Sequence, residues 1–190
     1  MRNTAIAFFV VSLLLTLTCT APAQSVVTLK KQAESGSAYA QFILGTMYSQ
    51  GHGVTQDYAR AVYWYHKAAE QGYADAQGNL CAMYGDGHGV PQDYAQALAW
   101  CRKAAEQGLA PAQYSLGASY YQGLGVPQDY AEAYFWFDLA AAGNFKSSNV
   151  KQEDVYNRRE EAASHLSPAE LSQAQERARK WFELHPKRAQ

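Results

Sequence analysis

The sequence lacks any long run of charge of either sign. Its 190 residues carry 16 basic and 17 acidic side chains, for a formal net charge of -1. A protein that binds nucleic acid or an anionic membrane surface usually carries clustered lysine and arginine. We therefore expect no nucleic-acid partner.

Catalytic signatures are also missing. The chain contains no H-E-x-x-H, no G-x-S-x-G, no phosphate-binding glycine loop and no C-x-x-C. β-branched residues are few after the N-terminus and alanine is abundant, which favours helices. We expect an all-α protein with no catalytic residue, no cofactor and no metal.

Residues 1–23 have the pattern of a secretory signal peptide. Arg2 precedes an apolar run from Ala5 to Thr18, and Ala21-Pro22-Ala23 offers small residues for cleavage before Gln24. The run has about 14 residues, whereas a membrane span needs about 20. We expect an exported protein, periplasmic or secreted, with no membrane span in the mature chain; an uncleaved anchor is the alternative.

A repeat of 36 residues organises most of the chain. GHGV at 51–54 returns at 87–90, and GLGV follows at 123–126. A fixed period of this size is typical of solenoids. Three copies share this period and begin at Ala40, Ala76 and Ala112.

Each copy predicts two helices, A and B, around a glycine-rich turn. In the first copy Ala40, Leu44 and Tyr48 recur on one face of helix A. Gly51 stands where helix A must end and the chain must reverse, which favours a positive φ. An aspartate at a constant position is expected to cap each helix B: Asp57, Asp93 and Asp129.

The repeat predicts the organisation of the whole chain. A B-like helix from about Val26 to Ser35 forms an N-terminal cap within residues 24–35, and three repeats cover 36–143. A polar connection and C-terminal capping helices occupy 144–190, where Ser167-Pro168-Ala169-Glu170 is a predicted capping box.

Two cysteines remain after the signal peptide. Cys81 takes the place that Gly45 and Gly117 hold on the other A helices, and Cys101 lies one helical turn beyond Ala97 on helix B. Both point to the same helix contact, and an exported protein meets an oxidising compartment. We predict a Cys81–Cys101 disulfide; two buried thiols are the alternative.

The repeated pattern A-x-x-x-L-G-x-x-Y-x-x-G-x-G-V-x-x-D-x-x-x-A-x-x-W-x-x-K-A-A-x-x-G resembles the Sel-1-like repeat (SLR) family, a tetratricopeptide-like class, over residues 26–143. The resemblance implies a right-handed α-solenoid whose concave side, lined mostly by A helices, holds a peptide or protein. A cysteine-rich branch of the family includes members described as β-lactamase-like. This chain lacks the regular cysteine spacing of that branch.

Two other motifs are candidates for a metal site and a catalytic site. His52 and His88 lie in successive turns, and equivalent positions of neighbouring repeats are too far apart to share a zinc ion. Ser148 and Lys151 match S-x-x-K, but the companion S-D-N and K-T-G elements do not occur. We interpret the histidines as turn residues and assign no catalysis to Ser148.

The outward positions of helix A differ between copies, and the fold does not dictate them. They form a predicted partner-binding groove, although an ordinary mixed surface is the alternative. The groove candidates are Tyr39, Phe42, Thr46, Ser49, Gln50, Asp75, Asn79, Asp86, Tyr114, Tyr121 and Gln122.

We therefore expect an exported, non-enzymatic scaffold or adaptor that binds a peptide or protein. Two alternatives remain. One is a β-lactam or cell-wall amide hydrolase of the cysteine-rich SLR type, and the other is a structural subunit of an envelope complex.

Overall fold

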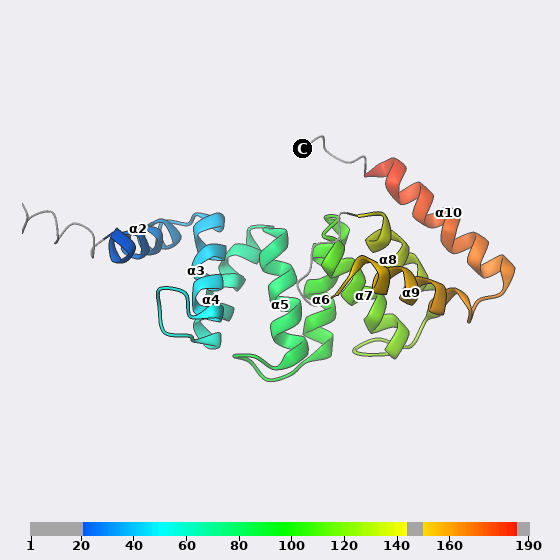
Figure 1. Ribbon diagram of the computed structural model, residues 1–190, viewed down its shortest axis with the longest axis horizontal. Coiled ribbons are helices and arrows are strands. Elements are labelled where there is room, and N and C mark those ends of the chain that lie inside the picture. The colour runs from blue at the N-terminus through cyan, green and yellow to red at the C-terminus, as the bar shows by residue number, and fades with distance from the viewer. Residues whose placement is uncertain (1–20, 144–149, 186–190) are drawn as a thin grey trace, which may run out of the picture.

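The computed structural model describes residues 21–143 and 150–185, and every regular element in these ranges is a helix (Figure 1). The predicted all-α class is confirmed. The signal-peptide prediction falls almost wholly outside the described residues. The helices are α2 (Ala21–Glu34), α3 (Ala38–Gln50), α4 (Tyr58–Glu70), α5 (Ala74–Asp86), α6 (Tyr94–Glu106), α7 (Ala110–Gln122), α8 (Tyr130–Ala142), α9 (Gln152–Ala163) and α10 (Pro168–Leu184).

Three helix pairs form the repeats and follow one another along the long axis of the molecule (Figure 1). α3, α5 and α7 are the A helices, and α4, α6 and α8 are the B helices. α2 stands before them as the lone B-like helix. It begins at Ala21, five residues before the predicted Val26.

Caps set the ends of these helices. Asp57, Asp93 and Asp129 are extended N-cap residues whose carboxylates accept backbone N–H groups at 2.9–3.0 Å. Gly51 ends α3 with φ +73°, in the left-handed region that glycine adopts most easily. Both predictions are confirmed.

A small residue meets a large one where helix A crosses helix B. A Cβ atom on Gly45 would lie 2.7 Å from the Tyr65 ring, and one on Gly117 would lie 2.8 Å from the Phe137 ring. In the middle repeat Cys81 and Cys101 hold the equivalent positions and are joined by a disulfide. Helix A therefore contacts helix B through a glycine and an aromatic ring in two repeats, and through a disulfide in the middle one.

The second glycine of the second and third GHGV-like turns has a role that the sequence did not reveal. A Cβ atom on Gly89 would lie 2.4 Å from the carbonyl carbon of Tyr58, and one on Gly125 would lie 2.5 Å from the oxygen of Tyr94. The turn of one repeat thus packs directly on the first residues of the preceding helix B. His88 adds to this contact, because its ring stacks on Tyr58 at 4.9 Å.

A buried glutamine links each helix A to the helix before it. Gln41, Gln77 and Gln113 are 4%, 4% and 2% exposed. Their Nε2 atoms donate to the carbonyls of Ala33, Ala69 and Ala105 at 3.0–3.1 Å. The Oε1 atoms of the first two accept from Gln71 and Gln107, each at 2.7 Å. Buried amides of this kind need such partners.

α9 continues the helix A pattern beyond the third repeat. Gln152 donates to the carbonyl of Ala141 at 2.8 Å, as Gln113 does to Ala105. Val155 is fully buried, like Leu116. Gln152 follows Gln113 by 39 residues, not by 36, so the extra residues of the connection hide this match from the period. The predicted cap contains a fourth A-type helix.

α10 turns back over α8 and does not pair with α9 as a B helix would (Figure 1). The predicted capping box opens it, with Ser167 and Glu170 each accepting the other's backbone N–H. Arg177 forms an ion pair with Glu132, and Gln175 donates to the Tyr134 hydroxyl at 3.3 Å. α10 therefore covers the outer side of the last repeat.

Replacement of Gly89 by alanine tests the docking of the turn. Gly72 is the matched control, because it also has a positive φ (+85°) but nothing lies within 4 Å of its Cβ position. Gly72→Ala should cost about 1–2 kcal/mol for the left-handed conformation alone. Gly89→Ala should cost at least about 2 kcal/mol more, because backbone must move. Urea denaturation measures both, and equal losses would contradict the contact.

Candidate functional site

The A helices form the inner side of the array. α5 contacts α7 directly, whereas no two B helices approach each other to the same extent. A stack of helix pairs curves toward the side on which successive helices lie closer together. The outward face of α3, α5 and α7 is here called the helix A face, and the contact between α5 and α7 agrees with its expected place on the concave side.

The helix A face carries charge of only one sign. α3, α5 and α7 contain no lysine or arginine, and their two formal charges are Asp75 and Asp86. The basic residues of the repeats all lie on B helices, at Arg60, Lys67, Arg102 and Lys103. A partner with positive charge would be attracted to this face.

The structure divides the predicted groove residues into two groups. Tyr39, Gln50, Asp75, Asp86 and Gln122 are exposed. Partly buried are Phe42, Thr46, Ser49, Asn79, Tyr114 and Tyr121.

Several of the partly buried candidates are engaged within the fold. The Tyr65 hydroxyl donates to Thr46 Oγ1 at 3.3 Å and lies 3.2 Å from Ser49 Oγ, which holds α3 to α4. The Tyr114 ring packs on Phe137 at 5.5 Å. These side chains shape the surface more than they project from it.

Tyr121 contacts α9. Its hydroxyl donates to Glu161 at 2.9 Å, and this hydrogen bond, with burial, raises the pKa of Tyr121. Its ring also meets Tyr130 and His165 edge-on. The far end of the helix A face is thus closed by α9.

A series of polar contacts between repeats, here called the polar ladder, was not predicted from the sequence. His66 Nε2 lies 3.0 Å from the Tyr84 hydroxyl, Arg102 donates to the Tyr120 hydroxyl, and Asp138 pairs with Arg159 at 3.1 Å. Burial lowers the pKa of His66. Positions 66, 102 and 138 are one period apart and all polar, and this spacing could have indicated the ladder. Because all three groups connect neighbouring helices, we interpret the ladder as structural.

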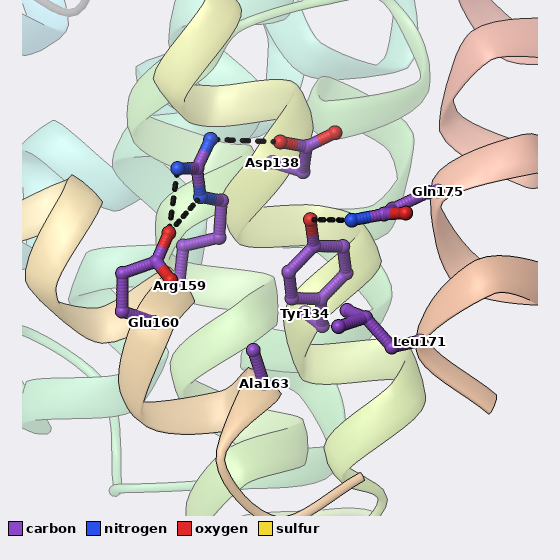
Figure 2. Close-up of a pocket in the computed structure, with 7 residues that line it drawn as sticks. All are labelled: Tyr134, Asp138, Arg159, Glu160, Ala163, Leu171 and Gln175. Atoms are coloured by element: carbon purple, nitrogen blue, oxygen red, sulfur yellow. Dashed lines mark hydrogen bonds and ion pairs between the residues drawn. The ribbon is translucent and has the colours of Figure 1, made fainter. Parts of the chain in front are cut away.

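A shallow cavity of about 370 Å³ lies between α8, α9 and α10 (Figure 2). Arg159 on its wall is neutralised by Asp138 and by Glu160, at 3.1 and 2.6 Å. The Tyr134 hydroxyl accepts from Gln175, and burial raises its pKa. Every polar side chain on the wall has a partner within the protein, so the cavity presents no unpaired group to a ligand.

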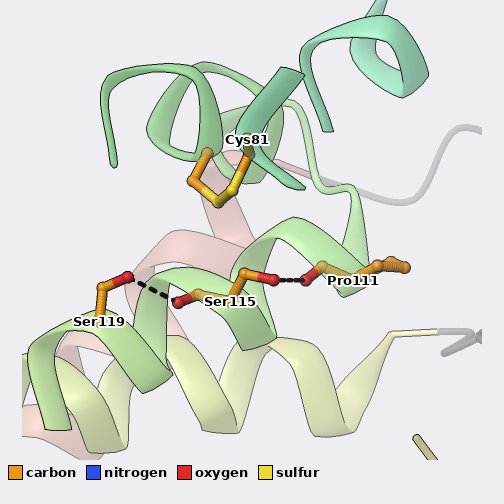
Figure 3. Close-up of a disulfide and its surroundings, with 5 residues drawn as sticks. Cys81, Pro111, Ser115 and Ser119 are labelled. Carbon is orange, nitrogen blue, oxygen red and sulfur yellow. Dashed lines mark hydrogen bonds between the residues drawn. A yellow bond between two sulfur atoms is a disulfide. The ribbon is translucent and has the colours of Figure 1, made fainter. Parts of the chain in front are cut away.

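The disulfide lies between α5 and α6, facing α7 (Figure 3). The Cα atoms of Cys81 and Cys101 are 5.0 Å apart, and Cys101 is 1% exposed. The nearby hydroxyls of Ser115 and Ser119 donate to carbonyls of their own helix, each at 3.0 Å. The surroundings suit a structural crosslink.

Residues 21–143 and 150–185 contain no group of three or more histidine, cysteine or acidic side chains placed to hold a metal ion. Within the same ranges no helix has the length and hydrophobicity of a bilayer span. His52 and His88 lie in exposed turns, as predicted. Ser148 lies outside the described residues.

Comparison with protein families finds one matching model, described as Sel1 repeat. It matches residues 38–73, 74–109, 110–145 and 169–184. The first two matches begin with α3 and α5 and end in the connection after each helix B. No protein of curated function matches the chain.

Two solved structures resemble much of the chain. One is c5321, a protective antigen of uropathogenic Escherichia coli displaying an SLR fold; identity is 36% over 88% of this chain, with a TM-score of 0.74. This chain spans only 36% of that protein. The other is a Sel1 repeat protein from Oxalobacter formigenes, 36% identical, covering 73% of this chain and 98% of its own, with a TM-score of 0.63.

Removal of the disulfide should destabilise the middle repeat. The double substitution Cys81→Ala and Cys101→Ala should lower the free energy of unfolding by about 2–4 kcal/mol under oxidising conditions. Cys81→Gly with Cys101→Phe should recover part of this loss, because it recreates the Gly117–Phe137 contact. Urea denaturation with and without dithiothreitol measures the effect. An unchanged midpoint for the alanine pair would show that the crosslink does not stabilise the fold.

Proposed function

Because this chain belongs to the Sel1 repeat family, we propose that it is an exported interaction module that binds a peptide or protein segment on its helix A face. The Sel1 repeat fold commonly mediates protein–protein interaction and is typically non-catalytic. The proposal adds to this general role a particular face and a particular compartment.

The observation that carries the proposal is that some positions of the repeat are constant while the outward positions of helix A vary. The buried glutamines Gln41, Gln77 and Gln113, which join one helix to the next, are constant. Outward positions of helix A vary: Tyr39 becomes Asp75 and then Pro111 one and two periods later. The fold tolerates each of these, so their identities are free to serve a ligand.

Binding would use a preformed surface. The helices beneath the helix A face are held by caps, buried hydrogen bonds and a disulfide. A rigid surface loses little conformational entropy when a ligand arrives, and this raises affinity for a given contact area. Tyr39 is 62% exposed, and exposed tyrosines are frequent anchors in interfaces.

Two features support export. The first 23 residues have the signal-peptide pattern, and the Cys81–Cys101 disulfide suits an oxidising compartment. A reducing cytosol would oppose this crosslink.

Photo-crosslinking in intact cells tests the binding face. A benzophenone amino acid at Asn79 or Gln122 should form protein adducts, because both lie on the helix A face. Tyr63 and Gln96 are matched control positions, exposed on B helices. Adducts analysed by mass spectrometry should come from the first pair and not from the second. Equal crosslinking from both faces, or none from the helix A face, would refute the proposal.

Export has its own test. Protein released from the periplasm by osmotic shock, or recovered from the medium, should begin at Gln24 when its N-terminus is sequenced. Full-length chain found only in the cytosolic fraction would refute export and leave the binding face untouched.

A further inference from the structure

Four residues form an aromatic–acidic cluster where the first repeat meets the second. Phe42 and Tyr73 have ring centroids 5.0 Å apart, with their planes tilted by 33°. Both rings are partly buried, whereas Tyr39 and Asp75 are exposed. Phe42 rests in turn on Tyr65, at 6.1 Å, so the cluster is anchored to the core.

The fold does not require these aromatic rings. One period later the same four positions are held by Asp75, Gly78, Leu109 and Pro111. There the Leu109 side chain closes over Gly78, and a Cβ atom on that glycine would lie 2.8 Å from it. A repeat junction therefore packs without any aromatic residue. The three rings at the first junction call for another explanation.

Asp75 gives the cluster its formal negative charge. No salt bridge in the described residues involves Asp75, and α3, α5 and α7 carry no basic side chain that could neutralise it. Burial raises the pKa of Tyr73, and the nearby groups of Asp75 and Tyr39 raise it further. Tyr39 lies three residues before Phe42 on α3, and Asp75 lies in the first turn of α5, next to its N-cap Tyr73. Both residues therefore flank the Phe42–Tyr73 ring pair.

We propose that the aromatic–acidic cluster of Tyr39, Phe42, Tyr73 and Asp75 binds an arginine side chain of the partner peptide. A guanidinium group stacks on aromatic faces and donates paired hydrogen bonds to a carboxylate, and the cluster offers both. The proposal rests on the proposed function, since it names the chemistry that the helix A face recognises.

The test is an NMR titration of the full chain with N-acetyl-arginine methylamide. The ligand should shift the amide signals of residues 39–42 and 73–75 saturably, with a dissociation constant on the order of millimolar. The matching glutamate derivative should cause no shift at these residues. Tyr39→Ala and Asp75→Asn should each weaken binding at least about fivefold, because each removes one of the two interactions.

Tyr63→Ala and Glu106→Gln serve as controls, because they remove an exposed tyrosine and an exposed carboxylate from B helices. Both should leave the affinity unchanged. Absence of saturable shifts at the cluster, or equal weakening by the control variants, would overturn the proposal. Crosslinking through the helix A face would still stand in that event, so the two proposals fail separately.

Discussion

The array depends on the hydrogen bond from a buried glutamine of one helix A to the last turn of the helix before it. The bond recurs at Gln41, Gln77, Gln113 and, on α9, Gln152. The free carbonyls at a helix end need donors, and a buried amide left unpaired would cost about 1–3 kcal/mol. Because this bond recurs at every junction, it places each helix A against the preceding helix in the same way.

The two sides of the array divide structure from recognition. Turn glycines and capping aspartates hold the helix ends and leave little room for change. The polar ladder from His66 to Asp138 joins neighbouring helices with a different residue in each repeat. The outer positions of helix A are released from these tasks. Charge follows the same division, since lysine and arginine of the repeats are confined to B helices.

Much of the fold was predictable because a period multiplies weak signals. The caps and the turns were predicted from residues that recur at the same position of each repeat. The Cys81–Cys101 pairing was predicted because both cysteines fall at positions where helix A meets helix B. The 36-residue period did not predict the C-terminal helices. α9 starts after a longer connection and so falls outside the period, and α10 packs on α8 through Arg177 and Gln175. The glycine-rich turn of each repeat was predicted, but the contact of Gly89 with Tyr58 joins two repeats and leaves no local trace in the sequence. The groove remains a prediction. The structure adds that Thr46 and Ser49 interact with the Tyr65 hydroxyl within the fold.

The fourth A-type helix limits how long a bound segment can be. α9 stands beside Tyr121 and ends the inner surface, while α10 lies on the outer side and adds nothing to it. Under the proposed function, a segment lying along α3, α5 and α7 would have to end beside Tyr121, because α9 stands in its path.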